Sequence, residues 1–302
     1  MSRAGYAAAA GACAAGAARL AYSAMSRRPP GGPKAWSRTN HRGEPVTLLE
    51  GPAVAAGAIV GVLAHGGQAS LGATSGSTGS SGSSGWRCAA AMVLGGAGAA
   101  AFGAYDDLAG SGDRRGFRGH LGALRQGEVT TGAVKLGGIG LTGLVSAALA
   151  GGSPADVILN AGLVAGGANL LNLFDLRPGR ALKVAAASGV LLGAAGQDSV
   201  AAPLGAGLAL LPEDLGERAM LGDAGANALG AMLGASAAGL SRPARKAPPR
   251  LWRPPWRCCP RTWASARCWV TPAQTRSARC SAPWRRACPG RPGSRCSPGS
   301  RD

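Results

Sequence analysis

The feature that most constrains this chain is the recurrence of long apolar stretches separated by short loops. Eight such stretches occupy residues 5–25, 51–66, 86–105, 132–150, 156–173, 183–196, 199–212 and 224–240. A helix needs about 20 apolar residues to cross a bilayer unassisted, and several stretches are shorter than that. Because Gly and Ala, common in these stretches, let membrane helices approach closely, the sequence predicts an all-α, polytopic membrane helix bundle with about eight spans.

Basic residues are distributed unevenly between the loops. With eight spans, the loops at 26–50, 106–131, 174–182 and 213–223 lie on one side of the membrane. They hold twelve Lys and Arg residues, whereas the opposite segments up to residue 241 hold only Arg3 and Arg87. Since cytoplasmic loops carry the excess of Lys and Arg, we expect a multi-pass plasma-membrane protein whose four basic loops are cytoplasmic.

The first stretch has an alternative interpretation as a cleaved signal peptide. Arg27 and Arg28 follow its Ala/Gly-rich run. That order of charges favours a retained first helix that ends on the cytoplasmic side.

The net charge of +18 belongs mainly to the end of the chain. Residues 242–302 hold 15 of the 32 Lys and Arg residues and one acidic residue, Asp302. The basic balance therefore describes this tail and does not indicate a nucleic-acid partner for the whole protein. We expect two regions, a membrane-embedded domain at 1–241 and a disordered, Arg/Pro/Cys-rich tail at 242–302.

The composition of the tail suggests an unusual origin. From Trp252 to Asp302 the only aliphatic residue larger than Ala is Val270, so no further membrane helix is expected there. We favour out-of-frame translation of a GC-rich gene, because the residues that dominate the tail have codons rich in G and C. A genuine disordered basic tail and a secreted disulfide module built on its six cysteines remain alternatives; zinc-ligand spacing is absent.

Acidic residues mark the ends of the predicted spans. Asp106 and Asp107 lie at the end of the stretch at 86–105. Adjacent carboxylates repel each other unless a cation or a basic partner compensates them. An ordinary solvated helix cap is the alternative, but this pair has no basic neighbour in sequence, which favours a functional role.

The third loop carries Asn169, Asn172 and Asp175 at a spacing of three residues. This spacing places them on one face of a helix that emerges at the cytoplasmic surface. Hydrogen bonding between helices is the alternative role for the two Asn residues. Asp175, followed by Arg177, suits a metal and phosphate site better.

The fourth loop ends in the sequence LGDAGANALG, which includes Gly222, Asp223 and Asn227. Exposed N–H groups at the start of the following helix can bind phosphate, and an aspartate there can hold Mg²⁺. A simple helix N-cap is the alternative for Asp223. We assign Gly222 and Asn227 to substrate binding.

Together these motifs resemble the polyprenyl-phosphate N-acetylhexosamine-1-phosphate transferases, which include the phospho-N-acetylmuramoyl-pentapeptide and undecaprenyl-phosphate GlcNAc-1-phosphate transferases. The resemblance extends over residues 26–240 and depends on D-D at 106–107, N-x-x-N-x-x-D at 169–175 and G-D-x-G at 222–225. It implies a Mg²⁺-dependent enzyme that transfers a sugar-1-phosphate from a UDP-sugar to a polyprenyl (undecaprenyl) phosphate and releases UMP.

The resemblance also implies roles for individual residues. Asp106 and Asp107 match the catalytic pair that handles the acceptor phosphate. Asp175 and Asp223 match acids that bind the metal near the nucleotide. Asn169, Asn172 and Arg177 are assigned to substrate binding.

The chain departs from the family at several positions. Gly110 stands where the peptidoglycan enzyme has a Lys, and we expect Lys135 to supply the missing phosphate contact. The family motif D-G-x-D-G reads here as DLRPG at 175–179, without the second acid. The last two family helices, and the His-bearing loop between them, have no match in residues 241–302.

Two other classes of function are compatible with the sequence. A transporter would line its path with intramembrane Asn and Asp side chains, whereas the acids here lie at span ends on one side. A catalytically inactive scaffold for envelope assembly is the other alternative. The oligomeric state is open, with a homodimer among the options.

Overall fold

The computed structural model describes residues 2–40, 42–72, 80–109 and 130–246, all of which lie in one compact unit, Met1–Pro248. The predicted α-helical class is confirmed for this part of the chain. Its eight α-helices are α1 (Arg3–Arg27), α2 (Glu50–Gly72), α3 (Ser80–Ala109), α5 (Thr131–Ala150), α6 (Pro154–Phe174), α7 (Arg180–Ala194), α8 (Ala201–Leu215) and α9 (Gly222–Lys246).

Three of the helices are long and apolar enough to cross a membrane, namely Trp86–Ala109 within α3, then α5 and α6. Each predicted apolar stretch coincides with a helix, but the finding supports a crossing for these three only. Helices α7 and α8 have 15 residues each, which corresponds to about 22 Å against a hydrocarbon core of about 30 Å. A count of about eight spans therefore stays a prediction.

The outer faces of these helices are apolar. Leu141 on α5 is 61% exposed, and Ile158 and Leu173 on α6 are each 67% exposed. Soluble proteins rarely expose contiguous apolar surface of this kind, whereas helices in contact with lipid do. The structure is thus consistent with a membrane protein.

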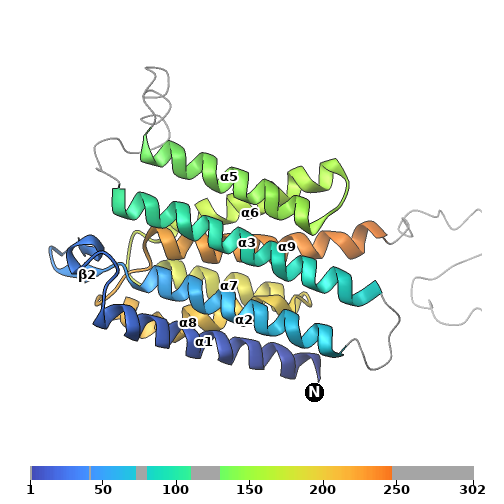
Figure 1. Ribbon diagram of the computed structural model, residues 1–302, viewed down its shortest axis with the longest axis horizontal. Helices are drawn as coiled ribbons and strands as arrows, with labels where there is room; N and C mark the ends of the chain where they lie inside the picture. Colours follow the sequence, from blue (N-terminus) through green and yellow to red (C-terminus); the bar gives the residue numbers. More distant parts are fainter. Residues whose placement is uncertain (1, 41, 73–79, 110–129, 247–302) are drawn as a thin grey trace, which may run out of the picture. The chain divides into compact units, whose positions relative to one another are not determined.

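The helices lie side by side, with α9 in contact with α2, α3 and α6, and α1 in contact with α2 and α8 (Figure 1). Small residues allow this close packing. A Cβ atom added at Gly230 of α9 would lie 2.2 Å from the carbonyl oxygen of Gly167 on α6, so these two backbones touch. Backbone contact through Gly is a recurrent feature of membrane helix pairs.

The predicted first loop contains a short antiparallel hairpin, β1 (Ser37–Thr39) and β2 (Pro45–Thr47), which the sequence analysis did not anticipate. The hairpin is joined to the fourth loop. Thr47 N–H donates to the carbonyl oxygen of Arg218 at 3.3 Å, and Met220 N–H donates to that of Thr47 at 2.9 Å. These bonds hold the first and fourth loops together at one end of the bundle.

The predicted boundary at residue 241 falls inside α9, which continues to Lys246. Residues 247–302 lie outside the described part of the chain. The predicted disorder of the tail and its out-of-frame origin therefore stay predictions.

Candidate active site

Two glycines bring α3 against the start of α9. A Cβ atom at Gly103 would lie 2.4 Å from the carbonyl oxygen of Asp223, and one at Gly222 would lie 3.2 Å from Oδ2 of Asp107. Gly222 also has a φ of +61°, in the left-handed region that favours Gly. Because Asp106 and Asp107 follow Gly103 by about one helical turn, this approach places both carboxylates beside the first residues of α9.

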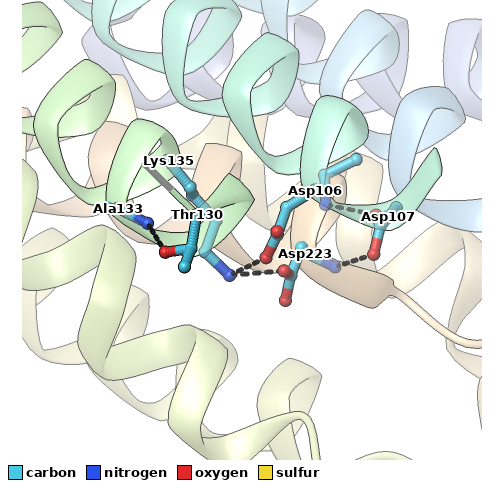
Figure 2. A network of polar contacts seen from close by, with 7 residues as sticks. Asp106, Asp107, Thr130, Ala133, Lys135 and Asp223 are labelled. Atoms are coloured by element: carbon cyan, nitrogen blue, oxygen red, sulfur yellow. Dashed lines mark hydrogen bonds and ion pairs between the residues drawn. The ribbon is translucent and has the colours of Figure 1, made fainter. Parts of the chain in front are cut away.

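Asp107 caps the start of α9. The backbone N–H of Asp223 donates to its Oδ1 at 3.2 Å, and that of Ala224 donates to its Oδ2 at 2.9 Å (Figure 2). A carboxylate is favourable at this position because the first N–H groups of a helix have no intrahelical partner. The N–H groups at this helix start were predicted to bind phosphate, and two of them are bonded to Asp107 in this structure.

Lys135 lies between Asp106 and Asp223. Its Nζ is 2.8 Å from Oδ2 of Asp106 and 2.5 Å from Oδ2 of Asp223, and the three side chains are 12–24% exposed (Figure 2). The three residues come from α3, α5 and α9. Within the described ranges, Lys135 is the one basic side chain that forms an ion pair with any of the four predicted site aspartates.

Asp175 completes the group from the C-terminal end of α6. Burial first, and then the nearby Asp214 carboxylate, raises the pKa of Asp175 well above its usual range, although a hydrogen bond from the Gly222 backbone opposes this shift. Burial also raises the pKa of Asp223, against the opposing charge of Lys135. The carboxylates of the three predicted acidic motifs thus converge around Gly222.

The three asparagines predicted to bind substrate have different surroundings in the structure. The Asn169 side chain donates to the carbonyl oxygen of Ala165, one turn earlier on its own helix, at 2.8 Å. Asn227 is fully buried, and its side-chain nitrogen and oxygen have no hydrogen-bond partner in the structure as described. Asn172 is half-buried. Among the described residues, none of these three side chains forms a hydrogen bond or ion pair with the four aspartates or Lys135.

Arg177 lines a pocket of about 420 Å³ that opens beside Asp175. Thr39 and Asn40 from the first loop, and Asp214 and Glu217 from the fourth loop, are among the other lining residues. The pocket therefore lies between three loops that are far apart in sequence.

Sequence reasoning missed two buried carboxylates near this group. Glu50 is fully buried with neither carboxylate oxygen hydrogen-bonded within the described chain, and burial, then Asp214, raises its pKa to about 9. Asp214 is 2% exposed and accepts a hydrogen bond from Gly179 N–H at 3.0 Å. Glu50 and Asp214 adjoin the predicted stretches at 51–66 and 199–212, on the side of the membrane where the other acids were predicted. This position is the sequence signal that could have identified them.

Arg38 is one of the twelve basic residues in the loops predicted to be cytoplasmic, and its guanidinium donates to the backbone carbonyl of Asp107. The same side chain donates to the carbonyl oxygens of Ala35 and Ser37 at 3.2 and 2.8 Å. Arg38 therefore fastens the first loop to the end of α3.

The donor chemistry of the site suits a hard divalent cation, because carboxylate oxygens are the ligands such ions prefer and four aspartates here have one basic partner. Within the described ranges, however, no group of three or more His, Cys, Asp or Glu side chains is arranged to hold a metal ion. Comparison of the chain with protein-family models, with curated proteins and with solved structures finds no match.

Proposed function

We propose that this protein transfers a sugar-1-phosphate from a UDP-sugar to a polyprenyl phosphate in bacterial cell-envelope polysaccharide or peptidoglycan synthesis. The observation that supports this proposal is the convergence of Asp106, Asp107, Asp175 and Asp223, with Lys135, at one end of a helix bundle that has an apolar outer surface. An enzyme of this kind must join a soluble nucleotide to a lipid, so its reactive groups belong at a membrane boundary.

In the proposed reaction, an oxygen of the acceptor phosphate attacks the β-phosphorus of the UDP-sugar. A new P–O bond forms the lipid-linked pyrophosphate, while the bond from the β-phosphorus to the oxygen bridging the α-phosphate breaks and UMP leaves. Asp106 or Asp107 would orient the acceptor or take up its proton. Lys135 would neutralise phosphate charge, because both reactants are anions and their repulsion opposes the approach.

Asp175 and Asp223 would hold the Mg²⁺ ion that the resemblance implies. When bound, this ion would offset the phosphate charges and polarise the attacked phosphorus. The surplus of carboxylates over basic side chains is the feature of this chain that favours a cation.

The proposal places the site on the cytoplasmic side of the plasma membrane, where nucleotide sugars are made. The basic loops predicted to be cytoplasmic include the segments that contribute Arg38, Asp107 and Arg177 to this end of the bundle. Arg177 and the adjoining pocket would then contact the nucleotide sugar.

The proposal is tested by Mg²⁺-dependent release of UMP from membranes that contain the protein, supplied with UDP-sugars and polyprenyl phosphate. We expect Asp107→Asn and Asp175→Asn each to lower the rate by about 10²-fold or more, the scale on which acid–base and electrostatic contributions act.

Asp198→Asn is the matched control, because Asp198 pairs with Arg3 at 3.0 Å and has no hydrogen bond or ion pair with the site in the described part of the chain. Its rate should stay near that of the wild type. Full turnover in both site variants would refute the assignment of the site. No UMP release from a folded wild-type protein would favour the transporter or scaffold alternative.

A further inference from the structure

We infer that Lys135 is a tethered cation that occupies the space between Asp106 and Asp223, so that a divalent ion must displace its ammonium group before it can bind both carboxylates. The inference rests on the proposed function in taking Asp223 as a ligand of the divalent ion, and it adds Asp106 as a carboxylate that the same ion would reach. It assigns to Lys135 a second role besides phosphate contact.

A divalent ion and the ammonium of Lys135 would compete for the same oxygen of each carboxylate. The Nζ atom lies 2.8 Å from Oδ2 of Asp106, within charge-assisted hydrogen-bond range, and 2.5 Å from Oδ2 of Asp223, which is closer still. Mg²⁺ binds oxygen at about 2.0–2.1 Å. An ion that used these two oxygens together would therefore take the space that the ammonium fills.

The remaining contacts show which carboxylate oxygens already have partners in the described part of the chain. Asp107 directs its two oxygens to the backbone N–H groups of Asp223 and Ala224. Asp106 and Asp223 each direct one oxygen, Oδ2, to Lys135. The partners of Asp107 are backbone groups at the start of α9, whereas the ammonium of Lys135 is at the end of a flexible side chain that can move away.

A displaced Lys135 has an obvious second partner. Its four-carbon side chain can swing while the backbone of α5 stays in place, and its ammonium binds phosphate oxygens as well as carboxylates. In such an exchange the divalent ion would take the carboxylates while the ammonium of Lys135 paired with the substrate phosphate.

The experiment measures Mn²⁺ binding to the purified full-length protein in detergent by electron paramagnetic resonance, with no substrate present. Lys135→Met removes the ammonium and keeps a side chain of similar length. We expect this variant to bind Mn²⁺ about tenfold more tightly than the wild type, since it removes a competing charge next to the ion. Lys135→Arg keeps the charge and should bind no more tightly than the wild type.

Lys183→Met is the matched control, because it removes the same charge from α7 near Asp214 and should leave the Mn²⁺ affinity within about twofold of the wild type. Adding Asp223→Asn to Lys135→Met should abolish the gain. Circular dichroism confirms that each variant is helical.

Equal or weaker Mn²⁺ binding by a folded Lys135→Met variant would overturn the inference, and so would a gain that survives Asp223→Asn. The outcome does not depend on turnover. A gain in Mn²⁺ affinity without UMP release would uphold the inference and refute the proposed function, whereas UMP release without the gain would do the reverse.

Discussion

At the scale of single residues, the carboxylates at the acidic end of this bundle differ in the partners that they have. Asp107 accepts two backbone hydrogen bonds and Asp106 forms an ion pair, whereas neither carboxylate oxygen of Glu50 has a hydrogen-bond partner in the described part of the chain. Asp214 is intermediate, because it is nearly fully buried with a hydrogen bond from Gly179. Burial therefore raises the pKa of Asp214 to about 6, despite that bond and the nearby charge of Lys183.

This shift predicts that Asp214 makes the protein less stable as the pH rises. The folded protein holds the proton between the unfolded pKa near 4 and the folded value of about 6, so the free energy of unfolding falls as pH rises through that window. Asp214→Asn, which can still accept from Gly179, removes this loss. We expect the free energy of unfolding of this variant at pH 7 to exceed that of the wild type by on the order of 1–2 kcal/mol.

Thermal unfolding in detergent at pH 4 and pH 7 measures this difference between the variant and the wild type. Asp198→Asn, whose carboxylate is 28% exposed and paired with Arg3, serves as the control and should show no such gain. If the stability difference between Asp214→Asn and the wild type does not grow from pH 4 to pH 7, the raised pKa of Asp214 is not the cause of the loss.

At the scale of helices, the site depends on how closely α3 approaches α9. Gly103 is the contact point, since a Cβ atom there would meet the backbone carbonyl of Asp223 at 2.4 Å. The obstacle is backbone and not the end of a flexible side chain, so the helices themselves would have to separate. Such a separation would weaken the bonds from Asp107 to the start of α9.

Gly103→Ala is therefore expected to lower the stability of the protein by about 1–3 kcal/mol, as overpacking does, and to reduce UMP release together with it. Gly137→Ala is a matched control in α5, because a Cβ atom there meets nothing within 4 Å. The control should be neutral or stabilising by up to about 1 kcal/mol, since Ala favours helix more than Gly does. Equal unfolding temperatures for the two variants would show that Gly103 does not set the α3–α9 distance.

At the scale of the whole molecule, the bundle combines an apolar exterior with one acidic end. The short connection at Gly151–Ser153 joins α5 to α6, and the segment from Asp175 to Gly179 joins α6 to α7. If α6 crosses the membrane, as its length and composition allow, these two connections face opposite sides.

Cysteine labelling measures this arrangement. In a variant with every native cysteine replaced, Ser153→Cys should react with a membrane-impermeant maleimide in intact spheroplasts, and Arg180→Cys only after permeabilisation. Both positions are exposed in the structure, so burial does not bias the comparison. Labelling of both positions without permeabilisation would place the acidic end outside the cytoplasm and remove the basis of the proposed function.

The sequence by itself determined the helical class, the positions of the helices and the ends at which acids gather, because apolar stretches and the charges that bound them are local properties. It did not determine which side chains meet. Lys135, which was predicted to contact phosphate, joins Asp106 to Asp223, a pairing that the sequence did not show, while Asn227 lies inside the bundle. Tertiary packing decided these outcomes, because the rotation of each helix about its axis depends on backbone contacts such as Gly103 with Asp223, which connect residues more than a hundred positions apart.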